Sequence, residues 1–463
     1  MALLSTLQNQ CTDMKKLWLI FYFIPLLSIP VRSQKPGDIV SGPMLGGVEL
    51  RTAKIWLDVS SGVHSISLEY WKEGHPEKLF KKDFSGSLGA EFNPVQLEIG
   101  GLEINTRYHY RFVLNHVPSQ AAGYFQTKDL WQWRKQAPDF SFLTGSCAYF
   151  NDPSYDRPGK PYGGDSLIFE SMARDSASFM LWLGDNWYTR EVDIMDAWGL
   201  WHRASRDRSQ PVLQNLLKSM PQYAIWDDHD FGPDNSGTSY GLKEVSREIF
   251  MKYWCNPFYG EGQKGIYTQL SYSDVDLFLT DDRWWRSADE LEDSLNEKPN
   301  PGKHFFGDQQ LAWLEDALVQ SQAVFKIIVV GSQVLNPLSR DEGLYRYSYE
   351  YHELFDFLNR MKIKGVLFLT GDRHHSEIIQ VKRPGNYDLY DITVSPFTSG
   401  VAFVKGPEIN NPARVPGSLL EMRNYAKMSV EGKTGERILR VRFCGVDGQK
   451  RYSWSISEKQ LIP

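Results

Sequence analysis

The N-terminal part of the chain alternates apolar and polar positions in short runs. Four such runs, at residues 54–59, 65–71, 95–99 and 108–114, are separated by glycine, asparagine and proline. Alternation with a period of two puts apolar side chains on one face of a strand, and the turn residues end each strand. The region from 46 to 127 is therefore predicted to form a small β-sandwich.

A tyrosine corner is expected at residues 102–110, where Tyr108 stands at the start of a late strand. In such a corner the buried ring hydroxyl bonds back to the chain just upstream. The corner suggests a fibronectin-type or immunoglobulin-type topology. Because no residue of this region has an evident chemical role, we expect a module that packs against or positions another domain.

After a polar linker at residues 131–138, the pattern changes to strands that alternate with helices. Residues 308–320 and 349–361 repeat apolar side chains at helical spacing, and each precedes an apolar, β-branched run. This order of elements predicts an α/β fold. The other expected elements are a helix at 165–173 and strands at 140–143, 179–183, 224–226, 275–280, 327–330, 365–370, 390–394, 438–443 and 452–456.

The first residues have the pattern of an export signal. Lys15 and Lys16 precede an apolar run at residues 17–29, and residues 31–33 provide a cleavage site. The run is shorter than the roughly 20 residues that a membrane-spanning helix needs. We therefore expect a signal peptide at 1–33, a β-sandwich at 34–128 and a catalytic domain at 139–463, with no membrane span after cleavage.

Composition narrows the range of partners. The chain has 463 residues, 41% of them hydrophobic, which is enough for two or three packed domains. Its formal net charge of -6 leaves no basic excess, so binding of nucleic acid by bulk charge is not expected. Once Cys11 is removed with the signal, three cysteines remain, and at least one is unpaired in a monomer. No oligomeric state is predicted.

Four predicted strands end in residue types that bind metals. The motifs are GSCAY at 145–149, GDNWY at 184–188, WDDHD at 226–230 and GDRHH at 371–375. In an α/β fold, ligands collect at the carboxyl ends of strands, so these motifs should converge on one edge. Carboxylates, histidines and a thiolate crowded there would repel one another or change protonation unless cations bind them. The four motifs together predict a metal site.

Each motif has a simpler interpretation when taken alone. A Gly-Asp pair after a strand is commonly a turn in which the aspartate side chain accepts a hydrogen bond from the backbone. A free cysteine such as Cys147 is commonly buried and inert. The presence of all four motifs favours metal binding. The spacing of Asp185 and Tyr188 allows a carboxylate and a phenolate to reach one ion, and a phenolate with a thiolate favours Fe(III) over Mg(II) alone.

The motifs resemble those of the PhoD-like alkaline phosphatase and phosphodiesterase family, a branch of the calcineurin-like metallophosphoesterases related to purple acid phosphatases. The resemblance implies an α/β fold with a four-layer α/β/β/α sandwich, whose second sheet the C-terminal strands complete, after a fibronectin-like or immunoglobulin-like β-sandwich. It extends over residues 140–400 and includes DDR at 281–283, QLAWL at 310–314, VGSQV at 330–334 and VSPFTSG at 394–400.

The resemblance also implies a site for two metal ions that share Asp185 as a bridging ligand. The first ion would be Fe(III), and the second a divalent cation that prefers oxygen ligands, most simply Ca(II). The implied ligands are Cys147, Asp185, Tyr188 and His374 for the first ion, and Asp185, Asp228, Asp372 and Gln333 for the second.

Two further residues would act on the substrate. His229 would stabilise the phosphate or protonate the leaving oxygen; a histidine with a purely structural role in a turn is the alternative. The planar guanidinium of Arg283 would match two phosphate oxygens. A structural ion pair with the neighbouring Asp281 or Asp282 is the alternative for Arg283.

These inferences predict an exported enzyme, periplasmic, on the cell surface or secreted, that hydrolyses small phosphate esters by attack of a metal-activated hydroxide. A phosphodiesterase or phospholipase D-type activity at the same site is one alternative. A non-enzymatic surface protein or glycan-binding protein is the other, suggested by the 15 tryptophans and the predicted β-sandwich.

Overall fold

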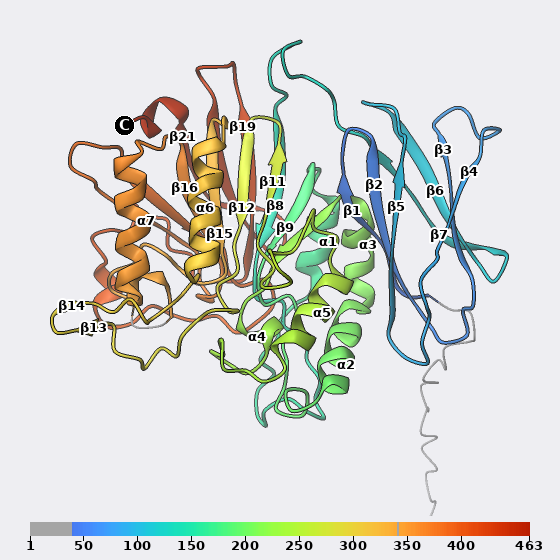
Figure 1. The fold of residues 1–463 in the computed structure, drawn as a ribbon. Coiled ribbons are helices and arrows are strands. Elements are labelled where there is room, and N and C mark those ends of the chain that lie inside the picture. Colours follow the sequence, from blue (N-terminus) through green and yellow to red (C-terminus); the bar gives the residue numbers. More distant parts are fainter. Residues whose placement is uncertain (1–38, 340–341) are drawn as a thin grey trace, which may run out of the picture. The chain divides into compact units, whose positions relative to one another are not determined.

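The computed structural model describes residues 39–339 and 342–463 (Figure 1). The predicted signal peptide, its cleavage site and Cys11 lie outside these residues. Within the described ranges, no helix combines the length and the apolar content that a membrane crossing requires. Residues 147, 255 and 444 are buried cysteines without a disulfide partner.

Two antiparallel sheets form the N-terminal region, and all four strands predicted there are present. Both sheets contribute to one hydrophobic cluster, which includes Leu57, Leu68 and Phe112. The first sheet has the order β1-β2-β5, with β1 (Ile39–Val48), β2 (Thr52–Val59) and β5 (Asn93–Gly100). The second has the order β4-β3-β6-β7, with β3 (Ile66–Lys72), β4 (Phe80–Asp83), β6 (Arg107–Leu114) and β7 (Val117–Gln126).

The hydrogen bond expected of a tyrosine corner is present. Tyr108 begins β6 with its ring buried, and its hydroxyl accepts a hydrogen bond of 3.0 Å from the backbone N–H of Glu103. The bond links β6 to the chain immediately before it. Leu102, in the same segment, contributes a buried side chain to the hydrophobic cluster that includes Tyr108. The local prediction from residues 102–110 is therefore confirmed.

The rest of the chain forms two mixed six-stranded sheets. Strands β8, β9 and β10 are mutually parallel in the first sheet, as are β12, β15, β16 and β18 in the second. The first sheet has the order β10-β9-β8-β19-β20-β21 and contains β8 (Phe140–Gly145), β9 (Phe179–Leu183), β10 (Gln222–Ile225), β19 (Asn424–Glu431), β20 (Ile438–Gly445) and β21 (Lys450–Ser457). The second has the order β11-β12-β15-β16-β18-β17 and contains β11 (Thr268–Tyr272), β12 (Val275–Leu279), β15 (Phe325–Val330), β16 (Val366–Thr370), β17 (Glu377–Val381) and β18 (Leu389–Thr393).

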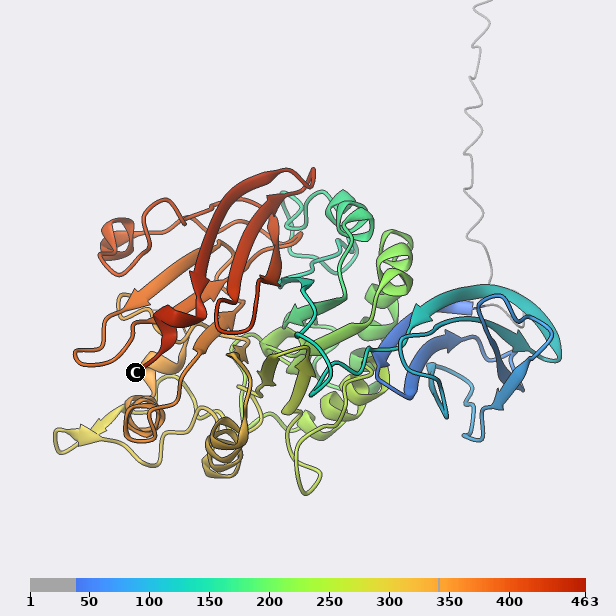
Figure 2. The same ribbon diagram turned by 90° about the horizontal axis from the view of Figure 1, so that it is seen from above.

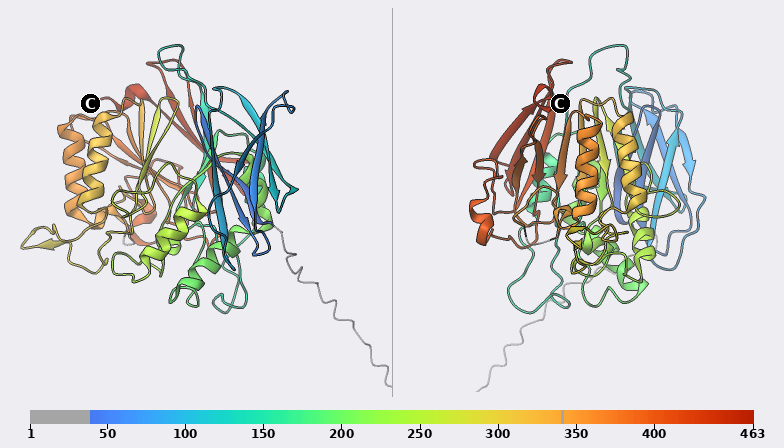
Figure 3. Two further views of the ribbon diagram at one scale, coloured as in Figure 1. Left: turned by 45° about the vertical axis from the view of Figure 1, so that its right-hand side comes forward. Right: turned by 60° about the vertical axis from the view of Figure 1, so that its left-hand side comes forward.

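The C-terminal strands differ from the expectation. Only β18 joins the second sheet, whereas β19, β20 and β21 extend the first sheet. Strand β19 pairs antiparallel with β8, with Met428 opposite Phe142. Figures 2 and 3 show these strands in red, on the side of β8 away from β9 and β10. The backbone N–H and C=O groups on the edge of β8 away from β9 need hydrogen-bond partners, and β19 provides them.

Helices pack over the two six-stranded sheets. Strands β9, β12, β15 and β16 are buried at every residue, as expected for strands covered on both faces. Helices α6 and α7 lie side by side over the second sheet (Figures 1 and 3). The helices are α1 (Leu167–Arg174), α2 (Ala197–Arg208), α3 (Gln214–Ser219), α4 (Asp228–Phe231), α5 (Lys243–Tyr253), α6 (Asp308–Gln320) and α7 (Ser348–Arg360).

Short elements complete the described chain. They are the 3-10 turns η1 (Pro211–Leu213), η2 (Leu344–Arg346), η3 (Gly406–Asn410) and η4 (Glu458–Leu461), and a ribbon of β13 (Ser294–Leu295) and β14 (Lys298–Pro299). The sequence predicted neither the ribbon nor the turns, because runs this short have no periodicity.

The first N-terminal sheet is bonded to the end of α5. The indole N–H of Trp56 in β2 donates to the carbonyl of Lys252 at 2.8 Å. The side-chain amide of Gln96 in β5 donates to the carbonyls of Met251 at 2.7 Å and Trp254 at 2.9 Å. These bonds satisfy carbonyls that the last turn of a helix leaves without partners. The separation of residues 34–128 from 139–463 as two domains remains a prediction.

Trp56→Ala tests how much this contact stabilises the protein. Trp56 is fully buried against Tyr253, so its loss should lower the free energy of unfolding by about 3–5 kcal/mol. Trp133→Ala is the matched control, because Trp133 is fully exposed and its change should stay within roughly 0.5 kcal/mol. Urea unfolding followed by circular dichroism measures both values. Equal effects of the two substitutions would contradict the described packing.

Candidate metal centre

The four motifs predicted to bind metal follow the ends of four strands. Cys147 follows β8, Asp185 follows β9, Asp228 begins α4 just after β10, and His374 follows β16. The first three strands are parallel neighbours in one sheet, so their carboxyl ends lie at the same edge. The fourth strand comes from the other sheet. The site is therefore built where corresponding ends of the two sheets meet.

One group of ligand atoms comprises the Cys147 thiol, the Asp185 carboxylate and the His374 imidazole, which all lie within 4.8 Å of one another. The thiol lies 3.5 Å from Oδ2 of Asp185. The Tyr188 hydroxyl lies 2.8 Å from the same oxygen and 3.3 Å from Nε2 of His374. All four residues assigned to the first ion thus point at a common centre.

A second group of ligand atoms comprises Asp185, Asp228 and His229, again all within 4.8 Å of one another. Asp185 therefore belongs to both groups, which is the arrangement that a bridging ligand requires. Oδ2 of Asp228 is held by the backbone N–H of Asn235 at 2.8 Å, and it lies 4.0 Å from Nε2 of His229. The sequence assigned His229 to the substrate, but in the structure its ring is also close enough to serve as a ligand.

Backbone conformation at the site is unusual. Cys147, Asp185, Asp372 and His374 have φ angles of 63°, 52°, 65° and 56°, in the left-handed region that residues other than glycine seldom adopt. Such conformations are strained and persist only where several surrounding contacts stabilise them. They are most frequent at functional sites. One such contact is the backbone N–H of His374, which donates to the hydroxyl of Ser395 at 3.0 Å. The strain marks this edge as functional.

His374 is oriented by the loop that follows β18. Its Nδ1 lies 2.7 Å from the carbonyl oxygen of Gly400, which can only accept a hydrogen bond, so Nδ1 carries the hydrogen in the neutral ring. The Tyr162 hydroxyl lies 2.9 Å from the same nitrogen. Nε2 is thereby left with a lone pair directed at Asp185 and Tyr188. A metal-binding histidine commonly has this arrangement.

Burial of so many acidic groups shifts their protonation. Burial, and then the charge of Asp372, raises the pKa of Cys147 to about 11, and burial and nearby acids raise the pKa values of Asp185 and Tyr188 well above their ordinary values. Burial also lowers the pKa of His374. The protein alone therefore disfavours the deprotonated forms of Cys147, Asp185 and Tyr188, which are the forms that bind metal. Bound cations reverse this preference, because they stabilise the deprotonated ligands.

Asp228 behaves differently from the other acids. Burial alone would raise its pKa, but the charges of His229 and Arg283 and the hydrogen bond from Asn235 outweigh it, so the pKa of Asp228 is lowered. Burial raises the pKa of Asp372 to about 7. Asp372 lies near the centre, although its carboxylate belongs to neither group of ligand atoms within 4.8 Å. Its assignment as a ligand remains a prediction.

Gln333 lies beside the second sheet, outside both groups of ligand atoms. Its amide nitrogen donates to Oε1 of Glu377 at 2.9 Å and to the hydroxyl of Thr393 at 3.0 Å. Its amide oxygen is buried and has no hydrogen-bond partner. That oxygen is the one atom of the side chain that remains for a cation, and the assignment of Gln333 stays a prediction.

Arg283 is fully buried in an ion-pair cluster. Its Nε lies 2.6 Å from the carboxylate of Asp227, and its Nη1 lies 2.8 Å from that of Glu342. Its remaining nitrogen donates to the hydroxyl of Ser332 at 3.2 Å. A phosphate would have to displace these partners, so the geometry favours the structural ion pair over the phosphate clamp. The close partners are Asp227 and Glu342, and the adjacent Asp282 that the sequence suggested lies at the longer distance of 3.9 Å from Nε.

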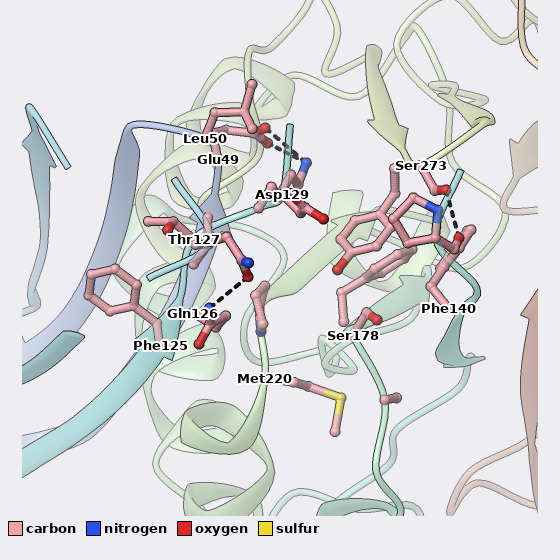
Figure 4. Close-up of a pocket in the computed structure, with 18 of the residues that line it drawn as sticks. Glu49, Leu50, Phe125, Gln126, Thr127, Asp129, Phe140, Ser178, Met220 and Ser273 are labelled. Atoms are coloured by element: carbon pink, nitrogen blue, oxygen red, sulfur yellow. Dashed lines mark hydrogen bonds and ion pairs between the residues drawn. The ribbon is translucent and has the colours of Figure 1, made fainter. Parts of the chain in front are cut away.

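A cavity of about 450 Å³ opens beside the ligand groups, and Tyr188 and His229 form part of its wall. A second cavity of about 510 Å³ lies between the N-terminal sheets and the first six-stranded sheet, lined by Glu49, Phe125 and Phe140 among others (Figure 4). None of the candidate ligands borders this second cavity. Of these two cavities, the one beside Tyr188 is therefore the candidate for binding a substrate.

The comparisons with known proteins agree with this geometry. A model of the PhoD-like phosphatase family matches residues 142–429, which is more than half of the chain. The chain belongs to the PhoD-like phosphatase family. The matched span includes every candidate ligand from Cys147 to His374 and leaves out the two N-terminal sheets. The description of this family is that of phosphatases, enzymes that hydrolyse phosphoric esters.

Relatives of known name support the family assignment. Alkaline phosphatase D of Bacillus subtilis (strain 168) is 21% identical over 356 residues, covering 67% of this chain but only 58% of that protein. A solved structure of PhoD superposes with a TM-score of 0.73 at 17% identity, over 93% of this chain and 92% of the other. A solved structure of a purple acid phosphatase from seeds of yellow lupin (Lupinus luteus) superposes with a TM-score of 0.65 at 12% identity. The superposition covers 90% of this chain and 74% of the other. At these identities, the similarity to the solved structures concerns the fold.

Gly184→Ala tests the tight approach of the chain at Asp185. Gly184 has a φ of +94°, and a Cβ there would lie 2.6 Å from Cβ of Asp227, so we expect a loss of roughly 2–4 kcal/mol in the free energy of unfolding. Gly74→Ala is the control, because Gly74 has a φ of +80° with nothing within 4 Å, and only the backbone cost of about 1 kcal/mol applies. Chemical unfolding of both variants measures the difference. A similar loss in both would contradict the described contact.

Proposed function

We propose that this member of the PhoD-like family is an exported, metal-dependent phosphoesterase. The observation that carries the proposal is the shared position of Asp185, whose carboxylate belongs to both groups of ligand atoms beside the 450 Å³ cavity that Tyr188 and His229 line. A carboxylate common to two donor groups suits two cations that act on one phosphate.

The donor atoms suit two cations of different character. Cys147, Tyr188 and His374 offer sulfur, phenolate and imidazole donors, which together with Asp185 favour Fe(III). Asp228 and the other oxygen of Asp185 offer carboxylates, which suit Ca(II) or a similar divalent ion. Cys147 and Tyr188 have raised pKa values and have to lose a proton to bind an ion, so binding of metal would release these protons and weaken as the pH falls.

The cations, once bound, would lower the pKa of a water and neutralise charge on the phosphoryl oxygens. The chain itself would then orient the ester and move one proton. Burial lowers the pKa of His229, and the carboxylates of Asp234 and Asp228, 3.6 Å and 4.0 Å from its Nε2, oppose this shift. The ring also packs against that of Tyr188, tilted by 33° with a centroid separation of 4.2 Å. We assign to His229 the transfer of a proton to the leaving oxygen.

The architecture is part of the same proposal. Two mixed sheets with helices outside them correspond to a four-layer α/β/β/α sandwich, and the two N-terminal sheets correspond to a fibronectin-like β-sandwich domain at residues 34–128. The catalytic domain would comprise 139–463. Export would follow from the signal peptide at 1–33, and a small phosphate ester would be the substrate. Whether that ester is a monoester or a diester is settled by comparing the two with the same preparation.

Removal of metal should abolish hydrolysis. Purified protein should contain iron together with a divalent cation in comparable amounts, and prolonged chelation should remove hydrolysis of a generic monoester and diester. Activity should return when Fe(III) and Ca(II) are restored. Elemental analysis and rate measurements check both steps. Full activity in chelated, metal-free protein would rule out the proposed chemistry.

Asp185→Ala and His229→Ala should separate binding of metal from movement of the proton. The first should lose most metal and all measurable turnover, because it removes a ligand from both groups. The second should retain the iron and lose about 10²–10⁴-fold in kcat, the usual contribution of a general acid. Asp316→Ala and His64→Ala, at exposed positions away from the site, are controls and should keep both properties. Normal turnover in either test variant would contradict its assigned role.

A further inference from the structure

The cavity beside the metal centre has more room than a phosphoryl group needs. Its volume is about 450 Å³, which lies within the range of about 300–1,000 Å³ that is typical of sites for whole small molecules. Tyr188 and His229 line it, so the cavity begins where the phosphate would be held. The space beyond these two residues is available to the organic part of the ester.

Aromatic and apolar side chains line much of this space. The ring of Tyr149 packs edge-on against Tyr162 at 4.9 Å and against Tyr188 at 5.0 Å, and Ile194 and Pro233 add apolar surface. The Tyr149 ring cannot turn away, because its hydroxyl donates to Asp156 at 2.7 Å. Fixed aromatic surface of this kind suits a flat ring, which packs against it at little cost in conformational entropy.

Three cations also line the cavity, but only two of them are available. Arg190 is buried and bound to Asp156 and to the carbonyls of Tyr188 and Phe150. Arg157 is exposed, with a single pair to the exposed Glu191 at 3.3 Å, and such a pair is weak.

Lys160 is the second available cation. It has no ion pair within the described ranges, and its side chain is exposed. Both available cations belong to the loop 151–164 rather than to the ligand groups. They therefore suit a negative charge at some distance from the phosphate that reacts.

We infer that the cavity binds the leaving group of the ester, and that this leaving group contains a ring and carries a second negative charge which Arg157 and Lys160 bind. The inference rests on the proposed function and extends it to a substrate class. Tyr162 and Ile194 contact the ring, while the two cations of the loop 151–164 select for the distal anion. These residues act on affinity, so their substitution changes KM and leaves kcat almost unaltered.

The ring is tested by comparing phenyl phosphate with glycerol phosphate on the metal-loaded protein. Phenyl phosphate should have a KM about tenfold lower, because burial of a ring contributes on the order of 1.4 kcal/mol or more. Ile194→Ala should raise the KM for phenyl phosphate about threefold and leave that for glycerol phosphate unchanged. Equal KM values for the two esters would overturn the assignment of the ring.

The distal anion is tested with 4-carboxyphenyl phosphate against phenyl phosphate. The carboxylate should lower KM about fivefold, and a variant with both Arg157→Ala and Lys160→Ala should lose this preference, since each exposed charge contributes about two- to threefold. Lys433→Ala, at an exposed position in the β19–β20 turn, should keep it. Persistence of the preference in the double variant, or its absence in the unaltered protein, would overturn the role of the two cations.

A binding measurement separates failure of this inference from failure of the proposed function. If no ester is hydrolysed, the proposed function is wrong, and calorimetry with the non-hydrolysable 4-carboxyphenyl phosphonate decides the inference by itself. Binding that weakens severalfold in the double variant supports the cavity as a site for a ring-bearing dianion. Equal binding by both proteins, or none by either, overturns it.

Discussion

The collection of acidic side chains in a buried place is the constraint on which the rest of the structure depends. Asp185 is in contact with a thiol and a phenol that are both deprotonated only at a considerable cost in free energy, as the raised pKa values of Cys147 and Tyr188 indicate. Such a set is stable only with compensation by positive charge. Arg283, which is paired with Asp227 and Glu342, contributes part of it, because its charge helps to lower the pKa of Asp228.

The two-sheet architecture meets this constraint geometrically. Parallel strands present their carboxyl ends at one edge, and the loops after β8, β9, β10 and β16 can therefore place ligands from distant parts of the chain within a few ångströms of one another. The left-handed conformations at Cys147, Asp185 and His374 allow each loop to turn at once after its strand. Hydrogen bonds from the loop after β18, through Ser395 and Gly400, hold His374 in place.

Much of this arrangement could be predicted because its signals are local. Each ligand motif follows a run of apolar residues, and the tyrosine corner depends on Tyr108 and the residues just before it. The burial of Arg283 could not be predicted, because its partners Asp227 and Glu342 come from other segments of the chain. Tyr162 was missed for the same reason: it lies in a loop without periodicity and reaches His374 only in the folded chain. Strands β19–β21 belong to the first six-stranded sheet because β19 pairs with β8 at the other end of the α/β region. No local sequence pattern predicts this pairing.

That pairing has a consequence for the order of events during synthesis. Strand β8, which Cys147 follows, leaves the ribosome well before its neighbour β19 has been made. Contacts between such distant segments form slowly, because a long loop has to close before they stabilise the fold. The edge of β8 therefore remains open in the nascent chain, and a chaperone or rapid translocation would protect it from aggregation. His374, the last of the donors along the chain, follows β16, so any ions that the donor groups hold would be acquired only after this strand has been made.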